Sequence, residues 1–226
     1  MPDTLASYSL YVALLSILYG AILALYQTNF FRLLAYGSMV HMGFILYSLS
    51  LNTVVGTASS IFYLLVYIVL MVFVFSFMFF FYEKNESNDN VCFLDDISKL
   101  YAVLNKNYLL SLYFAFIIVS LAGLPFFVGF VSKWHIFAGV SFKGQFVELI
   151  LLIGASVLSS AYYIRLIRFL FFIEKKDMKI KFYTTIKLNK SFYILIVFLF
   201  ILNILIIFYH NWLYLYILKC LLNLFK

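Results

Sequence analysis

Long runs of apolar residues dominate this sequence and limit the folds that it can adopt. Residues 59–82, for example, consist almost entirely of Phe, Leu, Val, Ile, Met, Tyr and Ser. About 20 apolar residues form a helix long enough to cross a bilayer, where each backbone polar group needs a partner within the protein. Only 11% of the 226 residues are charged, whereas a soluble domain carries about 25%. The sequence therefore predicts an all-α, polytopic membrane protein.

We predict six transmembrane helices within a single transmembrane helical domain, residues 1–226. The fourth apolar segment is too long for one straight helix, because it would extend about 50 Å against a hydrocarbon core of about 30 Å. We expect it to break near Pro125, since proline lacks an N–H group and clashes with the carbonyl four residues earlier. The six predicted spans cover residues 4–26, 33–51, 59–82, 108–140 (broken), 145–172 and 192–213.

The basic residues gather in alternate loops, which predicts the orientation of the chain. One set of loops holds twelve of them and the other set holds three, and Lys133 belongs to neither. Basic loops stay in the compartment where a membrane protein is made, so we expect both termini to face the opposite compartment. The net charge of +7 is thereby explained by orientation, and we expect no nucleic-acid partner. The twelve are Arg32, Lys84, Lys99, Lys106, Arg165, Arg168, Lys175, Lys176, Lys179, Lys181, Lys187 and Lys190; the three are Lys143, Lys219 and Lys226.

Familiar cofactor and metal motifs are absent from the sequence. It contains no P-loop, dinucleotide-binding glycine motif, CxxC pair or zinc-type histidine cluster. Its two cysteines, Cys92 and Cys220, fall in different segments and predict neither a disulfide nor a metal site. We expect the chain itself to bind no cofactor and no metal. The one long polar segment, residues 83–107, is expected to contain a short surface helix over 93–104.

Lys133 is the strongest functional signal in the sequence. A charge at the middle of a bilayer costs about 2.5–3.5 kcal/mol on insertion scales, so such a residue normally faces a protein interior or a water-filled cavity. All nine carboxylates fall in loops, tails or span ends, which leaves Lys133 without a counter-ion inside the spans. A buried lysine without a partner can lose and regain its proton. The alternative is a lysine that extends to the membrane interface.

Gly123, Pro125 and Gly129 predict a helix break beside this lysine. Backbone groups freed at membrane depth must be satisfied by water or polar side chains, and broken helices line ion sites in transporters for this reason. An ordinary proline kink without functional water is the alternative. We assign the three residues to a helix break that gives water access to Lys133.

His41 lies about two turns into the second predicted span and is the second candidate for proton transfer. Histidine changes its charge near neutral pH more easily than any other side chain. A neutral core histidine bonded to a neighbour fits the sequence as well, and both interpretations stay open. Supporting candidates are Tyr36 and Ser38 near His41, His135 on another face of the Lys133 helix, and Arg165, which either anchors its helix at the headgroups or reaches a polar channel.

Three segments resemble the antiporter-like subunits of respiratory complex I. NFFRLLAYGSMVHMGF, residues 29–44, resembles the family segment N-x-K-R-x-L-A-Y-S-S-x-x-H-x-G, with Phe31 in place of the usual Lys and Arg32 retained. SLAGLPFFVGFVSKW, residues 120–134, resembles the family's broken helix, L-A-G-x-P-x-x-x-G-F-x-x-K. SSAYYIRLIRFLFF, residues 159–172, looks like the helix that follows. The order and separations also agree, and the resemblance extends over nearly the whole chain.

The resemblance is greatest to the chain 2 branch of NADH–ubiquinone oxidoreductase, because chain 4 relatives carry Glu where Lys133 stands; the chain 5 branch stays open. The family consists of two inverted helical repeats, and this chain matches only the second repeat and the closing helix. The resemblance therefore implies the second inverted-repeat half of the antiporter-like fold. It also implies a split gene, with the N-terminal half and its Glu–Lys pair on a separate polypeptide.

The function that this resemblance implies is proton translocation by a non-redox membrane-arm subunit of complex I, NADH:ubiquinone reductase (H⁺-translocating). Lys133 would be the protonatable group and His41 would relay protons toward it. FMN, iron–sulfur clusters and ubiquinone are expected elsewhere in the complex. Expected partners are lipids, the other membrane-arm subunits and the separate N-terminal half. The heavy use of Phe, Tyr, Ile, Lys and Asn is typical of an A/T-rich genome, which points to the mitochondrial inner membrane with both termini toward the intermembrane space.

Two other functions remain open at this stage. One is a subunit of a multisubunit sodium/proton antiporter, which shares the motifs; sodium transport would favour carboxylates within the spans, where the sequence has none. The other is a structural membrane subunit that no longer pumps, against which the presence of Lys133 and His41 argues.

Overall fold

The structure is a computed structural model that describes residues 3–80, 82–84, 91–93, 108–172 and 190–224. This part of the chain forms seven helices and one small β-hairpin, which confirms the predicted all-α membrane fold. The helices are α1 (Asp3–Leu25), α2 (Phe30–Ser50), α3 (Val54–Phe80), α5 (Tyr108–Ala122), α6 (Val128–Phe142), α7 (Phe146–Phe172) and α8 (Lys190–Leu224). The strands β1 (Tyr82–Lys84) and β2 (Val91–Phe93) pair antiparallel. Most of the predicted surface helix at 93–104 lies outside the described residues.

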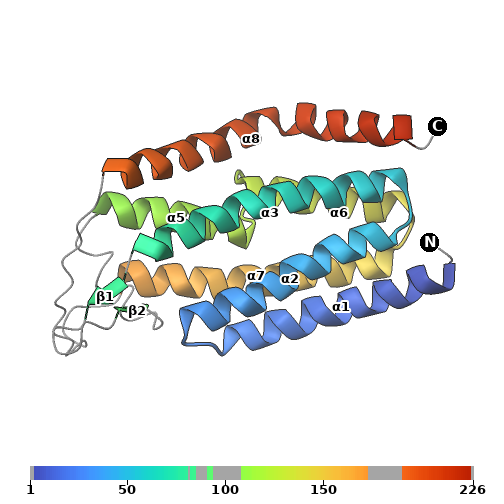
Figure 1. The fold of residues 1–226 in the computed structure, drawn as a ribbon. Helices are drawn as coiled ribbons and strands as arrows, with labels where there is room; N and C mark the ends of the chain where they lie inside the picture. Colours follow the sequence, from blue (N-terminus) through green and yellow to red (C-terminus); the bar gives the residue numbers. More distant parts are fainter. Residues whose placement is uncertain (1–2, 81, 85–90, 94–107, 173–189, 225–226) are drawn as a thin grey trace.

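Five of the described helices are long and apolar enough to cross a membrane, namely α1, α2, α3, α7 and α8. The predicted fourth span is a pair of helices of 15 residues each, α5 and α6, separated by residues 123–127. This confirms the expected break near Pro125. Figure 1 shows α5 and α6 following one another along the bundle, with the break about halfway along it. The pair thus occupies the predicted fourth span, 108–140, as two short helices.

Both ends of the described chain lie at the same end of the bundle (Figure 1). The turns between α2 and α3 and between α6 and α7 lie at that end as well, whereas the α1–α2 turn and the hairpin lie at the other. Lys143 and Lys219 therefore lie near the end with the termini, and Arg32 and Arg165 near the opposite end. The described basic residues are thus distributed as the loop count predicts.

The start of α3 differs from the predicted span for a local reason. Helix α3 begins at Val54 and not near Ser59, because the Thr53 hydroxyl accepts a hydrogen bond from the Gly56 N–H at 3.0 Å and so caps the helix. Helix α8 extends to Leu224, so the residues that follow the predicted span 192–213 continue the same helix. Helix α2 begins where the Asn29 side chain accepts from the N–H groups of Phe31 and Arg32.

Small residues bring α1 and α2 into close contact. A Cβ atom added to Gly43 would lie 2.5 Å from Ile17 Cγ1 and 2.6 Å from Ser16 Oγ. One added to Gly20 would lie 3.0 Å from the carbonyl oxygen of Tyr36. Lipid tails are as apolar as the side chains themselves, so helices in a membrane associate largely through such tight packing. The pair forms one side of the bundle, and α3 packs between α2 and α8.

Replacing Gly43 by Val should weaken the α1–α2 contact, because overpacking a tight interface costs about 1–3 kcal/mol. Gly154 on α7 has no atom within 4 Å of the position of an added Cβ, so Gly154→Val is a matched control. We expect a lower Tm in detergent for Gly43→Val than for Gly154→Val. Equal Tm values would contradict the close packing of α1 and α2.

Candidate functional site

The break between α5 and α6 follows from four successive residues, Ala122-Gly123-Leu124-Pro125. Gly123 adopts a φ of +74°, its N–H donates to Ser120 O at 3.1 Å, and the Leu124 N–H donates to Val119 O at 3.5 Å. These bonds form the Schellman motif, which ends helices at a glycine in the left-handed conformation. Pro125 then prevents the helix from continuing. The motif uses the carbonyls of residues 119 and 120 and leaves the carbonyl of Ala122 free to accept another donor.

Lys133 supplies that donor from the second turn of α6. Its Nζ donates to Ala122 O at 3.0 Å and to Ser159 Oγ of α7 at 3.2 Å. The side chain is 3% exposed. Nζ also lies 5.7 Å from the centre of the Phe44 ring of α2, within the range of a cation–π contact. Four helices therefore surround this amino group within the bundle.

No carboxylate approaches Lys133 in the part of the chain that the structure describes. The sole carboxylate with a described side chain is Glu148, in the first turn of α7. It lies eleven residues before Ser159, about 16 Å along the helix axis. The C-terminal end of α5 takes the place of a counter-ion, because the free carbonyls at a helix C-terminus carry about half a negative charge.

Close contacts leave no space for a side chain at Gly123 or Gly129, the two glycines of the break. A Cβ on Gly129 would lie 1.8 Å from Ser120 O, so the first turn of α6 packs directly on the last turn of α5. A Cβ on Gly123 would lie 2.9 Å from Lys133 Nζ. Gly123 therefore serves twice, since it permits the left-handed turn and leaves space for the lysine.

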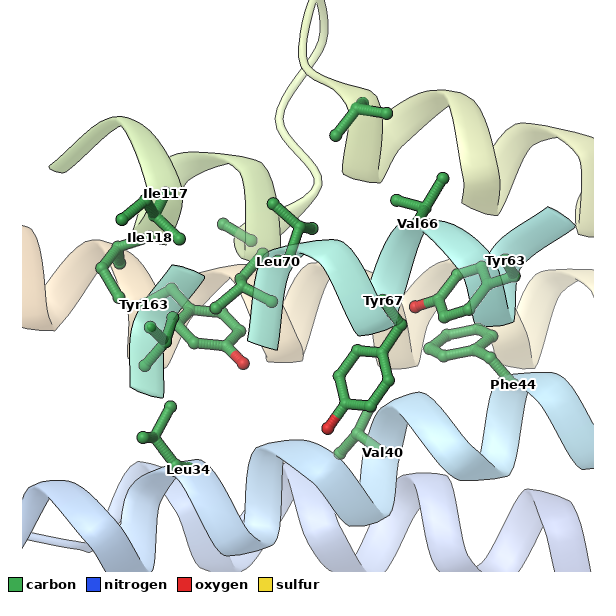
Figure 2. Packing of buried hydrophobic residues seen from close by; sticks show 14 of the residues in the cluster. Leu34, Val40, Phe44, Tyr63, Val66, Tyr67, Leu70, Ile117, Ile118 and Tyr163 are labelled. Atoms are coloured by element: carbon green, nitrogen blue, oxygen red, sulfur yellow. The ribbon is translucent and has the colours of Figure 1, made fainter. Parts of the chain in front are cut away.

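His41 lies on the same face of α2 as Phe44, one turn earlier, and is 4% exposed. Its Nδ1 lies 2.7 Å from the Tyr63 hydroxyl of α3, and its Nε2 lies 3.3 Å from the Tyr163 hydroxyl of α7. The ring of Tyr67 is 4.9 Å away, centre to centre. Figure 2 shows the hydroxyl groups of Tyr63 and Tyr163 directed toward each other from opposite sides. Both ring nitrogens of His41 are thus in hydrogen bonds with tyrosine hydroxyls.

The structure places the supporting candidates in different surroundings. Ser38 donates to Ala35 O at 2.7 Å and lies one turn before His41 on α2. The backbone of Tyr36 packs against Gly20 of α1. Arg165 donates to the carbonyls of Leu25 and Gln27 at the C-terminal end of α1.

His135 faces α8, away from Lys133. Its ring stacks on Tyr214 at 4.0 Å between centres, and the ring of His210 lies 6.1 Å away. His135 Nε2 is buried without a hydrogen-bond partner among the described residues. It is therefore separate from the group formed by Lys133 and His41.

Three polar residues of the site, Ser159, Tyr63 and Tyr163, were not singled out by the sequence analysis. Ser and Tyr recur throughout the apolar runs, with 19 tyrosines in the chain, and their spacing does not distinguish those that reach the site. Ser159 and Tyr163 lie within residues 159–172, the third segment that resembles the family, and this was the available signal for them.

Gly123→Ala should destabilise the protein through both functions of this glycine. Gly144, in the turn between α6 and α7, has a φ of +76° and no atom within 4 Å of an added Cβ, so Gly144→Ala measures the left-handed backbone cost alone, about 1–2 kcal/mol. We expect a larger loss of Tm for Gly123→Ala, because its methyl group would also displace Lys133. Losses of equal size would contradict the close contact between Gly123 and Lys133.

Comparisons with known proteins agree with the observed fold. The family model described as "NADH:quinone oxidoreductase/Mrp antiporter, TM" matches residues 2–160. NADH-quinone oxidoreductase subunit N of Wolbachia sp. subsp. Brugia malayi is 34% identical over 76% of this chain and 35% of its own length. NAD(P)H-quinone oxidoreductase subunit 2 of Gloeothece citriformis is 32% identical over 79% of this chain and 34% of its own length. The chain thus spans about one third of the length of these relatives.

Two solved structures have the same fold over nearly the whole chain. One is a chain of respiratory complex I from Thermus thermophilus, with a TM-score of 0.73 and 23% identity, covering 92% of this chain and 44% of that one. The other is a chain of the membrane-bound sulfane sulfur reductase, an archaeal respiratory membrane complex, with a TM-score of 0.79 and 24% identity. It covers 96% of this chain and 42% of that one. The described helices therefore form an antiporter-like membrane fold.

Proposed function

This chain belongs to the NADH:quinone oxidoreductase/Mrp antiporter transmembrane family, and we propose that it moves protons across a membrane through Lys133 and His41. The observation that carries the proposal is the buried amino group of Lys133, which is held by a helix end and a serine, with no carboxylate beside it among the described side chains. A group in such surroundings can change its charge, because no fixed negative charge holds the proton in place.

The hydrogen bonds of Lys133 support proton exchange at its Nζ. An ammonium group and a neutral amine both carry N–H bonds, so either form can donate to Ala122 O and Ser159 Oγ. Proton loss therefore leaves the same acceptors in use. The break at Gly123, Pro125 and Gly129 provides the irregular backbone through which water reaches a site at membrane depth.

The position of His41 supports its role as the neighbouring relay. Phe44, whose ring faces Lys133 Nζ, follows His41 by one turn of α2. The two tyrosine hydroxyls that bond its ring nitrogens can each donate or accept a hydrogen bond. His41 can thus receive a proton at one nitrogen and release one at the other.

We further propose that the chain is a non-redox membrane-arm subunit of an H⁺-translocating NADH:quinone oxidoreductase, corresponding to the C-terminal part of chain 2. The names of the relatives support this assignment. Its partners would be the other membrane-arm subunits, lipids and a separate chain with the N-terminal half. FMN, iron–sulfur clusters and ubiquinone would be bound elsewhere in the complex.

The proposed location is the mitochondrial inner membrane, with both termini toward the intermembrane space. The composition and the uneven loop charges support this location and orientation. A sodium/proton antiporter subunit is the second candidate, because the family also includes Mrp antiporters. Sodium prefers oxygen ligands such as carboxylates, and the predicted spans carry none away from their ends. This favours protons.

Lys133→Ala tests the proposed proton transfer. We expect NADH-driven proton uptake by membrane vesicles to fall at least about tenfold, because positioned proton-transfer groups contribute about 10²–10⁴-fold, while the subunit still assembles. Lys219→Ala, on an exposed position of α8, is the control and should pump normally. An unchanged number of protons moved per NADH in assembled Lys133→Ala complex would contradict the proposal. Uptake that requires sodium ions would support the antiporter candidate instead.

Purification of the complex tests the proposed composition. We expect mass analysis of the mitochondrial inner-membrane enzyme to find this sequence and the N-terminal half, with its membrane Glu and Lys, on two separate polypeptides. Recovery of this sequence within one polypeptide of about three times the length of this chain would contradict the separate N-terminal half.

A further inference from the structure

A small cavity lies between His41 and the helix break. His41, Tyr63, Tyr67, Ser120 and Ser132 supply its polar lining. The space open to the centre of a water molecule is about 10 Å³, which is close to the least that holds one water. A water in a protein interior needs two to four polar partners, and this lining offers them.

Ser120 is the residue of this lining without a hydrogen bond of its own. Its side chain is fully buried, and its Oγ has no partner among the described residues. Other serines in these helices donate to a carbonyl three residues earlier, as Ser132 does to Gly129 O and Ser159 to Ser156 O. Leaving a buried hydroxyl without a hydrogen-bond partner lowers the stability of the fold by about 1–3 kcal/mol. A partner for Ser120 Oγ inside the cavity would remove this penalty.

Tyr63 connects this cavity to His41. Its hydroxyl is the close partner of His41 Nδ1, at 2.7 Å, and the residue also lines the cavity. The opposite wall belongs to the break, because Gly129 lines the cavity and Ser120 lies two residues before Ala122, which binds Lys133. The cavity therefore borders His41 and the helix break, and Lys133 is bound to the same break at Ala122 O without lining the cavity itself.

We propose that Ser120 holds one water molecule in this cavity and that this water and Tyr63 relay protons between His41 and Lys133. The proposal rests on the proposed function and names the groups that connect its two sites. The Tyr63 oxygen takes the Nδ1 proton of the His41 imidazolium and gives its own hydroxyl proton to the water. The water passes one of its protons across the break to the Lys133 amine. Each oxygen gains one proton and loses one, and a single positive charge moves from His41 to Lys133.

The matched variants Ser120→Thr and Ser120→Val test the role of the serine hydroxyl. Thr and Val have the same shape and differ in the hydroxyl group, so a purely structural role for Ser120 would affect both alike. We expect proton uptake by vesicles to be at least about tenfold lower for Ser120→Val than for Ser120→Thr, in the range known for positioned proton-transfer groups. Ser50 is also buried but donates to Tyr47 O, and its Thr and Val variants should pump equally.

Tyr63→Phe tests the tyrosine relay in the same assembled complex. It should lower proton uptake and change its solvent isotope effect, whereas Tyr113→Phe, on a half-buried tyrosine that packs on Phe200, should change neither. Equal uptake by the two Ser120 variants, or normal uptake by Tyr63→Phe, would overturn the relay. If Lys133→Ala still abolished pumping in that case, the proposed function would stand without this path. Normal pumping by Lys133→Ala would remove both.

Discussion

The hydrogen bond between Lys133 Nζ and the carbonyl of Ala122 joins two features that are each unfavourable alone. The Schellman motif at Gly123 ends α5 in mid-bundle and leaves a carbonyl without a backbone donor. A buried amino group without a partner is similarly unfavourable. Each satisfies the other, so the break and the lysine are a single structural unit. Gly123 makes this possible because a Cβ at that position would contact the lysine nitrogen.

The same kind of interaction occurs at two other places in the bundle. Arg165 of α7 donates to carbonyls at the C-terminal end of α1, and Lys143 donates to the carbonyl of Leu51, the C-cap of α2, at 2.8 Å. In all three cases a basic side chain from another helix satisfies the negative end of a helix dipole. Arg165 and Lys143 do so at the ends of the bundle. Lys133 does so at its middle, beside the helix break.

Sequence reasoning succeeded where the cause is local. Apolar runs predict helices, and Gly123 with Pro125 predicts the break, because a left-handed glycine followed by proline ends a helix wherever it occurs. The hydrogen-bond partners of Lys133 and His41 could not be predicted from such local patterns. Ser159 and Tyr63 reach Lys133 and His41 from helices that are distant in the sequence. Which of many serines and tyrosines does so depends on how the helices rotate and pack, and periodicity within one span does not fix this.

The counter-ion of Lys133 shows this limit most clearly. A search of the spans for carboxylates finds none, which leaves Lys133 without a counter-ion in the sequence analysis. The structure provides a partial negative charge from within the chain, at the C-terminal end of α5. The partial charge at a helix end belongs to the backbone and not to a charged residue type. A count of charged residues in the sequence therefore misses it.

The two proposed proton carriers differ in the direction of their contacts. Tyr163, His41 and Tyr63 come from α7, α2 and α3, so their hydrogen bonds cross the bundle from helix to helix. The break between α5 and α6 interrupts a helix that runs along the bundle (Figure 1). A proton that arrived at His41 would therefore travel across the helices, and one that left Lys133 through the break would travel along them. Lys133 and the cavity beside Ser120 lie near the point where these two directions meet. The proposed path would therefore depend on the few serine and tyrosine hydroxyls at this point.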